Sequence, residues 1–255
     1  MTGGKLIFRN EDLDFQRCKP EFVQAMYEDL KWLGLKWDEG PNEGGPFGPY
    51  CQSLRRNAYL KAWLQLRNAG FIYPCSCTRK DLERALQAPH EDDDEVHYPG
   101  FCRSKIGTAG NWDTPAGVSW RFRVPDGETV AFHDVNFGPQ SFVEGRDFTD
   151  FLIWRRDDIP AYQLAVVVDD AAMQITEVVR GADLLKSTAR QLLLIRALRY
   201  SVPQYFHCPL VTDARNVRLA KRHDALSLRT MRSQGIAPED LRRQFEREMD
   251  WRKSL

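Results

Sequence analysis

The sequence has no apolar run that approaches the about 20 residues of a membrane-spanning helix. Its first residues also lack the charged stretch followed by an apolar stretch that marks a secretion signal. We therefore expect a cytoplasmic protein with no membrane partner. Because cytoplasmic thiols are kept reduced, the six cysteines are expected to be free thiols or metal ligands rather than disulfides.

Net charge, internal repeats and low-complexity segments are also absent. Lys and Arg together number 36, as do Asp and Glu, which argues against a protein that binds polyanions indiscriminately but permits a local basic face. The 255 residues suffice to bury a substantial core, in one elaborated domain or two small ones. We expect the protein to act as a monomer.

Apolar periodicity predicts an α/β protein. A short strand at residues 6–8 precedes two amphipathic helices, one at 20–33 and one that runs from a capping serine at 53 to a glycine at 70. The later elements that we expect are a hairpin of residues 118–124 with 130–132, a strand at 164–168 buried on both faces, a strand at 174–179, a helix at 187–200 and a strand at 208–211.

Together these elements predict a parallel sheet of the nucleotide-binding type that is interrupted by a β-rich insertion at roughly residues 75–149. Open sheets of this type bind their ligands just beyond the carboxyl ends of the strands. Candidate site residues are therefore expected at that edge.

Three cysteines lie close together in the expected insertion. Cys75 and Cys77 follow a strand-like segment, and Cys102 comes one loop later. Three thiolates and one further donor form a closed tetrahedral Zn²⁺ site of the structural kind. His97 and Tyr98 are the candidates for the fourth ligand. His97 is the more usual zinc donor, whereas Tyr98 needs a neighbouring cation to lower its pKa. The alternative is three ordinary thiols, because C-x-C with one distant cysteine is weaker evidence than paired C-x-x-C motifs.

Four charged or polar residues lie near expected strand ends. Arg9 and Glu11 follow the first strand, Tyr162 precedes the strand at 164–168, and Arg180 follows the next strand. A Glu carboxylate suits an ammonium group and an Arg fork suits a carboxylate, so the set is complementary to an α-amino acid with an acidic side chain. Each residue also has an ordinary interpretation: a local ion pair for Arg9, a half-buried core aromatic for Tyr162 and a surface cation for Arg180.

A compact basic loop, Arg218-Leu219-Ala220-Lys221-Arg222-His223, follows the last expected strand. Lysines of this kind stabilise the charge that builds up on a triphosphate in the transition state, so Lys221 and Arg218 are candidates for catalysis and ATP binding. A solvated basic turn or a tRNA backbone contact explains the same residues.

Taken in order, these motifs resemble the catalytic core of the class I glutamyl-tRNA synthetases, in particular the short glutamyl-Q tRNA(Asp) synthetase family. The matching segments are Arg9-Asn10-Glu11-Asp12-Leu13-Asp14, Tyr73-Pro74-Cys75-Ser76-Cys77-Thr78-Arg79, Tyr98-Pro99-Gly100-Phe101-Cys102-Arg103, Ala161-Tyr162-Gln163-Leu164-Ala165-Val166-Val167-Val168-Asp169-Asp170, Val179-Arg180-Gly181-Ala182-Asp183-Leu184-Leu185 and Arg218-Leu219-Ala220-Lys221-Arg222. They span nearly the whole chain, and their combination is specific although each piece alone is weak.

The resemblance implies a class I synthetase-type Rossmann core, an inserted zinc-binding β-rich segment and a short helical C-terminal segment. It assigns residues 1–74 and 150–212 to the two parts of the core, 75–149 to the insertion, and 213–255 to the lysine loop and helical segment. About thirty residues follow His223, too few for a separate anticodon-reading domain.

The resemblance also implies roles for individual residues. Glutamate is contacted by Glu11, Tyr162 and Arg180, structural zinc is held by Cys75, Cys77, Tyr98 and Cys102, and Lys221 lies in a flexible ATP-binding loop. The implied reaction activates glutamate with ATP and Mg²⁺ and transfers it to the queuosine base of tRNA(Asp). Two alternatives stay open: a glutamyl-tRNA synthetase catalytic fragment that charges tRNA(Glu), and a catalytically silent tRNA-binding paralogue.

Two motifs of the resembled family do not occur in this sequence, namely the Ser-Pro-Thr-Gly turn and the His-Ile-Gly-His-like signature. Both belong to a first strand and helix whose N-terminus stabilises phosphate charge. We interpret the chain as an amino-terminally shortened version of a longer enzyme. An in-frame stop codon directly upstream of the Met1 codon, with no stretch encoding the turn before it, would contradict this interpretation.

Without these motifs, purified residues 1–255 are expected to catalyse little or no glutamate-dependent ATP–pyrophosphate exchange. The reason is that the helix N-terminus that stabilises phosphate charge is missing. Incorporation of labelled pyrophosphate into ATP measures the reaction, and robust exchange by residues 1–255 would show that the missing strand and helix are not needed.

Overall fold

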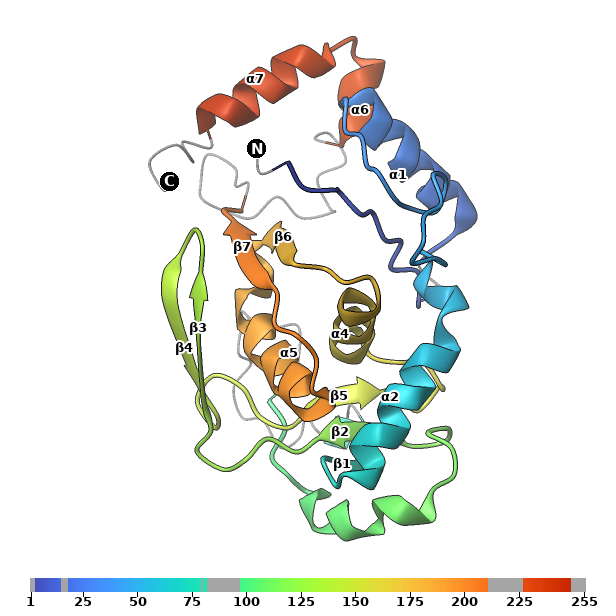
Figure 1. Ribbon diagram of the computed structural model, residues 1–255, viewed down its shortest axis with the longest axis vertical. Helices are drawn as coiled ribbons and strands as arrows, with labels where there is room; N and C mark the ends of the chain where they lie inside the picture. The colour runs from blue at the N-terminus through green and yellow to red at the C-terminus, as the bar shows by residue number, and fades with distance from the viewer. Residues whose placement is uncertain (1–2, 15–17, 79, 82–96, 211–226, 249–255) are drawn as a thin grey trace. The chain divides into compact units, whose positions relative to one another are not determined.

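The computed structural model describes residues 3–14, 18–78, 80–81, 97–210 and 227–248, whose course is shown in Figure 1. The α-helices are α1 (Pro20–Trp32), α2 (Arg56–Asn68), α4 (Tyr162–Ala172), α5 (Leu185–Leu198), α6 (Leu228–Ser233) and α7 (Pro238–Glu248). The strands are β1 (Ile72–Cys75), β2 (Ser119–Phe122), β3 (Thr129–Asp134), β4 (Gly138–Val143), β5 (Phe151–Trp154), β6 (Glu177–Gly181) and β7 (Gln204–Cys208). Short 3₁₀ helices are η1 (Gln52–Leu54), η2 (Arg103–Asn111) and η3 (Ala182–Leu184). No helix within these ranges is long and apolar enough to cross a membrane.

The chain divides into two compact units. One consists of Met1–Leu54 together with Cys208–Leu255, and the other of Arg55–His207. The functional segments expected from the sequence, with boundaries after residues 74, 149 and 212, stay predictions.

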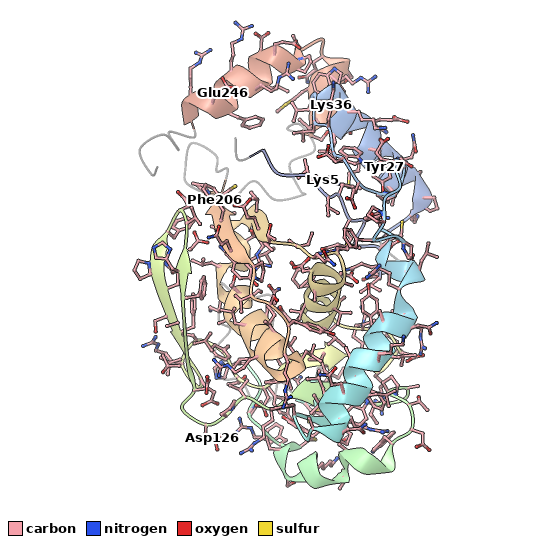
Figure 2. The ribbon with its side chains drawn as sticks, in the orientation of Figure 1. Lys5, Tyr27, Lys36, Asp126, Phe206 and Glu246 are labelled. Atoms are coloured by element: carbon pink, nitrogen blue, oxygen red, sulfur yellow. The ribbon has the colours of Figure 1, made fainter. Side chains whose placement is uncertain are left out.

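An aromatic cluster forms the core of the first unit. Helix α1 begins with Pro20, whose fixed φ suits the first helical position, and buries Tyr27. The ring centroid of Phe8 lies 5.6 Å from that of Tyr27 and 4.8 Å from that of Trp37. Figure 2 labels Tyr27 on α1. Packing of these rings holds the segment before α1 against the helix.

The strand expected at residues 6–8 is present only as isolated parallel bridges. Ile7 pairs with Glu39, and Asn10 pairs with Cys51. The segment is therefore extended but does not form a regular strand. It leads directly into an acid-rich cluster, Arg9-Asn10-Glu11-Asp12-Leu13-Asp14.

The expected helical C-terminal segment is present as α6 and α7, which contact α1 through polar groups. A nitrogen of Arg229 lies 3.1 Å from a carboxylate oxygen of Glu28 and another lies 3.6 Å from Asp29. Arg242 donates a hydrogen bond of 3.3 Å to the carbonyl of Leu33 at the end of α1. These contacts place basic side chains at the C-terminal end of α1, where the helix dipole favours them.

The second unit contains two sheets and has an α/β fold. Strands β1, β2 and β5 form an antiparallel sheet in the order β1-β2-β5. The other sheet has the order β4-β3-β7-β6 and is mixed, because β3 is antiparallel to β4 but parallel to β7, where Asp134 pairs with Tyr205. Helix α5 packs against β3 of this sheet.

Aromatic side chains join α2 to the antiparallel sheet. Trp120 on β2 meets Trp63 on α2 edge to face at 4.9 Å and Trp112 at 5.9 Å. Phe122 stacks on Phe151 of β5 at 5.2 Å. Large rings of this kind contribute most of the apolar area that a core buries.

The strand expected at residues 164–168 is wrong, because this segment is the middle of helix α4. All residues of α4 from Gln163 to Asp169 are buried, and the helix packs against α2, α5 and β5. A helix that is enclosed on every side has no polar stripe. Its apolar run therefore looks the same in sequence as a strand buried on both faces.

The hairpin expected from residues 118–124 and 130–132 is also wrong. Strand β2 pairs with β1 and β5, whereas β3 forms its hairpin with β4. The intervening turn joins the two sheets, and its Asp126, labelled in Figure 2, forms an ion pair with Arg103. Alternation identifies both strands correctly but carries no information about which strand is the partner.

The remaining expected elements, except the last strand, are confirmed with shifted ends. The helices at 20–33, 53–70 and 187–200 are α1, α2 and α5, and the strand at 174–179 is β6. The strand expected at 208–211 is wrong, because β7 ends at Cys208, residues 209 and 210 are not in a strand, and residue 211 lies outside the described residues. Ser53 does not cap α2, since the N-cap is Arg55. Instead, the amide and hydroxyl of Ser53 bind the carboxylate of Asp12 at 2.9 and 2.7 Å.

A buried ion pair connects α2 with α4. Nε of Arg55 lies 2.6 Å from one carboxylate oxygen of Asp169, and the Tyr59 hydroxyl donates to the other at 2.8 Å. The side chains of Arg55 and Asp169 are 7% and 0% exposed. Charges withdrawn from water to this degree are tolerated only while each has its partner.

Asp169→Asn is expected to lower the free energy of unfolding by about 3–5 kcal/mol, because it leaves the Arg55 guanidinium buried without its carboxylate. Urea unfolding followed by circular dichroism measures the change. The matched control is Asp157→Asn, which removes an exposed pair with Arg155 and should cost less than about 1 kcal/mol. Equal losses in the two variants would contradict a special role for the buried pair.

Candidate functional site

Arg180, at the end of β6, is surrounded by neutral acceptors. Its Nε donates to Nε2 of His207 at 3.1 Å, and Nη1 donates to the Gln191 side chain at 2.8 Å. Nη2 donates to the Thr188 hydroxyl at 2.6 Å and to the carbonyl of Leu184 at 3.5 Å. Within the described part of the chain, no carboxylate is paired with this guanidinium. The arrangement is that of a receptor for an anionic group.

His207 can accept from Arg180 only in one tautomer. Its Nδ1 lies 2.6 Å from a carboxylate oxygen of Asp134, so the proton resides on Nδ1 and Nε2 keeps its lone pair. Asp134 is held in turn by the backbone amides of Asn136 and Phe137, at 3.0 and 2.9 Å. His207 and Asp134 are both fully buried.

Electrostatics keep His207 neutral and Asp134 ionised. Burial and the adjacent Arg180 lower the pKa of His207, and together they outweigh the hydrogen bond with Asp134, which raises it. Burial alone would raise the pKa of Asp134, but hydrogen bonds from His207 and from backbone amides lower it overall. The guanidinium of Arg180 therefore faces an uncharged ring.

A chain of buried amides connects Arg180 with the start of α4. Gln191, which accepts from the arginine, donates to Gln163 at 3.0 Å, and Gln163 donates to the Ser187 hydroxyl at 3.2 Å. Gln163 directly follows Tyr162, the first residue of α4. The network that begins at Arg180 thus reaches Gln163, the sequence neighbour of Tyr162.

Tyr205 provides an aromatic face beside this network. The guanidinium carbon of Arg180 lies 5.3 Å from its ring centroid, and the ring stacks with His207 at 6.2 Å. Side chains alternate along β7, and Phe206, labelled in Figure 2, stands between the two stacked residues in sequence. Burial raises the pKa of Tyr205 to about 12, so the phenol stays protonated.

The acid-rich cluster of the first unit is held by backbone contacts. The amide of Asn10 donates to the carbonyl of Tyr50 at 2.8 Å, and the amide of Gln52 donates to the carbonyl of Asn10 at 3.0 Å. On either side of Asn10, Arg9 and Glu11 form an ion pair of 3.1 Å. The side chain of Glu11 is 39% exposed, so its carboxylate is accessible to a ligand.

The structure thus brings the expected site residues together in two groups. Arg9 and Glu11 belong to the first compact unit, and Tyr162 and Arg180 belong to the second. A pocket shared by all four stays a prediction. Lys221 and Arg218 lie outside the described residues.

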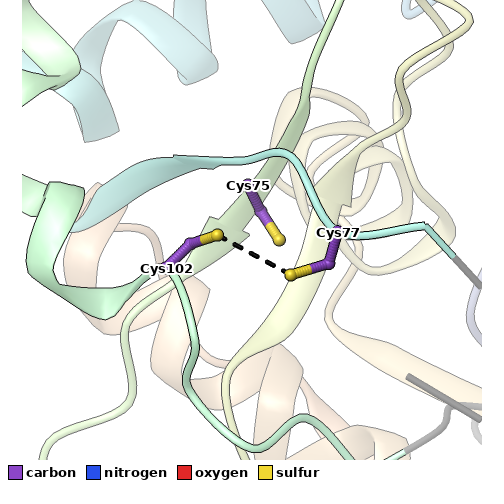
Figure 3. A group of neighbouring side chains, drawn as sticks. All are labelled: Cys75, Cys77 and Cys102. Atoms are coloured by element: carbon purple, nitrogen blue, oxygen red, sulfur yellow. Dashed lines mark hydrogen bonds between the residues drawn. The ribbon is translucent and has the colours of Figure 1, made fainter. Parts of the chain in front are cut away.

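The three cysteines of the expected metal site converge, as Figure 3 shows. The sulfur atoms of Cys75, Cys77 and Cys102 all lie within 4.8 Å of one another, and those of Cys77 and Cys102 are 3.7 Å apart. The hydroxyl oxygen of Tyr98 lies 3.5 Å from the Cys75 sulfur and 3.9 Å from the Cys77 sulfur. Among the described residues, the cluster of possible metal donors does not extend to His97.

These distances fit a tetrahedral zinc ion. With Zn–S bonds of about 2.3 Å and a Zn–O bond of about 2.0 Å, two sulfur ligands are about 3.8 Å apart and a sulfur and an oxygen ligand about 3.5 Å apart. The spacings of Cys77 with Cys102 and of Cys75 with Tyr98 agree with both values. The 3.9 Å between the Cys77 sulfur and the Tyr98 oxygen is longer than the second value. The three sulfur atoms are close enough to share one metal ion, with the phenol oxygen beside them.

The thiols of the cluster have opposite acidities. Burial and the nearby Cys75 raise the pKa of Cys77 to about 11. Burial would also raise the pKa of Cys102, but hydrogen bonds from the Ser76 amide, Tyr98 and Cys77 lower it to about 6. One thiolate thus suppresses the ionisation of its neighbours, and only a bound cation would permit several thiolates at once.

A cation does lie next to Tyr98, as a tyrosine ligand requires. The guanidinium carbon of Arg121 is 3.9 Å from the centre of the Tyr98 ring. Burial and a hydrogen bond with Cys75 nevertheless raise the pKa of Tyr98. The phenol is therefore neutral in this environment, and Arg121 alone does not ionise it.

Polar contacts behind the cysteines fix the loop that carries them. Arg103 forms two hydrogen bonds with Asp150, at 2.6 and 2.8 Å. Asp150 also accepts from the amide of Val124 at 2.9 Å and from the hydroxyl of Tyr73. Arg103 follows Cys102, and Tyr73 precedes Cys75 by two residues. Asp150 therefore holds both of the segments that carry the cysteines.

Sequence reasoning missed the acceptors of Arg180. His207, Thr188 and Gln191 come from three separate places in the chain, and Asp134 is 73 residues from its histidine partner. His207 is the one fully buried histidine among the described residues, a property that its local sequence does not show. Polar groups buried in this way have a specific partner.

Comparison with known proteins identifies relatives of this chain. The family model described as tRNA synthetases class I (E and Q), catalytic domain, matches residues 1–252. The glutamyl-Q tRNA(Asp) synthetase of Nitratidesulfovibrio vulgaris is 47% identical over 237 residues, which cover 92% of this chain and 73% of that protein. The protein of the same name from Symbiobacterium thermophilum is 46% identical over 244 residues, which cover 93% and 74%.

A solved structure shares the fold. The glutamate-tRNA synthetase of Elizabethkingia anophelis superposes with a TM-score of 0.73 at 29% identity, covering 86% of this chain and 46% of that one. The similarity therefore extends from sequence to architecture. This chain belongs to the class I tRNA synthetases of the E and Q type, a family of ligases.

Proposed function

We propose that the protein activates glutamate with ATP and transfers it to the queuosine base of tRNA(Asp). Two relatives named for this substrate are 47% and 46% identical to the chain. The single observation that carries the proposal is the guanidinium of Arg180, whose partners among the described residues are neutral. A cation that is partly buried without a counter-ion is suited to bind a carboxylate.

The proposed glutamate site assigns one role to each side chain. Arg180 binds a carboxylate of glutamate, and its hydrogen bond with Gln191, which in turn donates to Gln163, holds the guanidinium in place. Tyr162, at the start of α4, is assigned to the same substrate. Glu11 binds the ammonium group, because its carboxylate is accessible. Arg9 orients Glu11 through their ion pair. Together these groups position a substrate that carries two carboxylates and one ammonium group.

The proposed reaction has two steps. An oxygen of the α-carboxylate of glutamate attacks the α-phosphorus of ATP, and pyrophosphate leaves with Mg²⁺. A hydroxyl of the queuosine ring then attacks the carbonyl carbon of the glutamyl-adenylate, and AMP leaves. Lys221 and Arg218 are assigned to the negative charge on the triphosphate, where fixed cations lower the barrier by electrostatics.

We further propose that Cys75, Cys77, Cys102 and Tyr98 hold a structural zinc ion. The ion would supply the positive charge that lets neighbouring thiols ionise together. Its donors come from β1 and from the segment before η2, so it would fix the fold of the segment at 75–149 rather than take part in the reaction.

The preferred acceptor can be tested with the full native protein and four tRNA substrates. We expect labelled glutamate to be transferred to queuosine-containing tRNA(Asp), whether or not its 3′-terminal adenosine is removed. Queuosine-free tRNA(Asp) and tRNA(Glu) are the matched controls and should remain unlabelled, because neither offers the cyclic diol of queuosine.

Two results would contradict this assignment. Charging of tRNA(Glu) that depends on its terminal adenosine would indicate an ordinary glutamyl-tRNA synthetase, the activity for which the Elizabethkingia anophelis protein is named. Retained tRNA binding without glutamate-dependent ATP–pyrophosphate exchange would indicate a catalytically silent paralogue.

The metal site predicts about one zinc ion per chain. Cys77→Ser should lose most of the zinc, because it removes one sulfur of the cluster, whereas Cys208→Ser should retain it. Elemental analysis after gel filtration measures the zinc content. A strong chelator should remove the ion and expose the segment at 75–149 to limited proteolysis.

One result would contradict the prediction of a bound zinc ion. The native protein would contain no zinc, and its three clustered thiols would react freely with a thiol reagent before any chelator was added.

A further inference from the structure

Arg180 has one orienting contact that depends on a single lone pair, that of Nε2 in His207. Its four hydrogen bonds with protein acceptors use Nε, one hydrogen of Nη1 and both hydrogens of Nη2. The second Nη1 hydrogen has no acceptor among the described residues. A ligand carboxylate would therefore approach at Nη1, provided that Nε remains bound to Nε2 of His207.

We propose that Asp134 and His207 form a positioning pair for Arg180, in which the carboxylate selects the histidine tautomer that turns the guanidinium toward the substrate. This inference rests on the proposed glutamate site. Asp134 and His207 do not touch the substrate and act through the arginine.

The other states of the ring would repel Arg180. With the proton on Nε2, an N–H bond of His207 would face the N–H bond of Arg180 Nε across 3.1 Å. A doubly protonated ring would add a positive charge at the same place. In either state Nε would lose its acceptor, and burial would make that loss costly.

Asp134 has the geometry needed to select the tautomer. One of its oxygens accepts from the Nδ1 position of His207 at 2.6 Å, while the other accepts from the amides of Asn136 and Phe137. The His207 amide approaches the same carboxylate at 3.2 Å, and Asn136 donates to the His207 carbonyl at 2.9 Å. The carboxylate and the histidine backbone are therefore fixed relative to each other.

Thr188 contacts both Arg180 and His207. Its hydroxyl accepts from Arg180 at 2.6 Å and lies 3.3 Å from the Leu184 carbonyl and 3.2 Å from Nε2 of His207. The hydroxyl proton can be donated to the carbonyl while Nε2 accepts from Arg180. A proton on Nε2 would point to the Thr188 oxygen, whose two lone pairs could accept from both His207 and Arg180 Nη2, so the contact that the change of tautomer removes is the one at Arg180 Nε.

The decisive variant is Asp134→Asn. It keeps the shape of the side chain and the oxygen that accepts from the backbone amides, but places an N–H group opposite Nδ1 of His207. The ring must then accept at Nδ1, which moves its proton to Nε2. His207→Gln serves as the companion variant, because an amide oxygen can accept from Arg180 and has no tautomer to change.

The first measurement concerns the ring itself and requires no enzymatic activity. In residues 1–255, nitrogen NMR of the imidazole should report Nδ1–H for the wild type and Nε2–H for Asp134→Asn. The same tautomer in both proteins would overturn the proposal. Asp157→Asn, an exposed change of the same kind, should leave the wild-type tautomer in place.

The second measurement is the glutamate KM in ATP–pyrophosphate exchange by the full native protein. Loss of one hydrogen bond to a charged group predicts that Asp134→Asn raises KM on the order of tenfold or more, with a much smaller change in kcat. In the His207→Gln background the same Asp134→Asn change should have little effect. Equal effects in the two backgrounds would show a merely structural role and overturn the proposal.

Failure of the proposed function gives a different result. If the full wild-type protein shows no glutamate-dependent exchange, the glutamate assignment is contradicted. The tautomer comparison then decides the positioning role alone: Nδ1–H in the wild type with Nε2–H in Asp134→Asn supports it, and any other pattern overturns it.

Discussion

The site depends on one constraint: a partly buried guanidinium whose partners among the described residues carry no charge. Arg180 is oriented by a histidine, a threonine, a glutamine and a backbone carbonyl, each of which accepts a hydrogen bond without neutralising it. Desolvation makes such a cation costly unless an anion arrives, so the same contacts that orient the side chain also favour a carboxylate ligand. The neutral state of His207 is essential: burial and the adjacent Arg180 lower the pKa of the ring and outweigh the hydrogen bond with Asp134, which raises it.

The cysteine cluster is the converse case, because its donors suit a cation whereas Arg180 suits an anion. Cys75, Cys77, Cys102 and Tyr98 form a set of donors at zinc-like spacings, and the raised pKa of Cys77 shows that the thiols oppose one another's ionisation. In both places, hydrogen bonds fix the side chains. Asp150 and Arg103 hold the cysteine-bearing loops, and Arg180 is held by its neutral acceptors among the described residues.

Local patterns in the sequence predicted most of the helices better than they predicted the strand partners. The helix periods of α1, α2 and α5 were visible, and Arg180 could be proposed because it follows a strand end. The apolar run at 164–168 was predicted as a strand but lies in helix α4, because a helix buried on all sides and a buried strand share the same apolar composition. The acceptors of Arg180 could not be predicted, because Asp134, Thr188, Gln191 and His207 become neighbours only through the pairing of β3 with β7 and the packing of α5. Spacing alone likewise left His97 and Tyr98 as competing ligands, and the structure places the tyrosine oxygen among the sulfur atoms.

The central claim is that the Arg180 guanidinium binds a carboxylate of glutamate together with Tyr162 and Glu11. The most direct measurement is a crystal or cryo-EM structure of the full native protein with a non-reactive glutamyl-adenylate analogue. The account predicts a carboxylate of the glutamyl group at salt-bridge distance from Nη1 of Arg180, with Tyr162 and Glu11 in the same pocket and His207 still bound to Nε. An analogue bound elsewhere, or Glu11 and Arg180 on separate surfaces with no shared pocket, would contradict it.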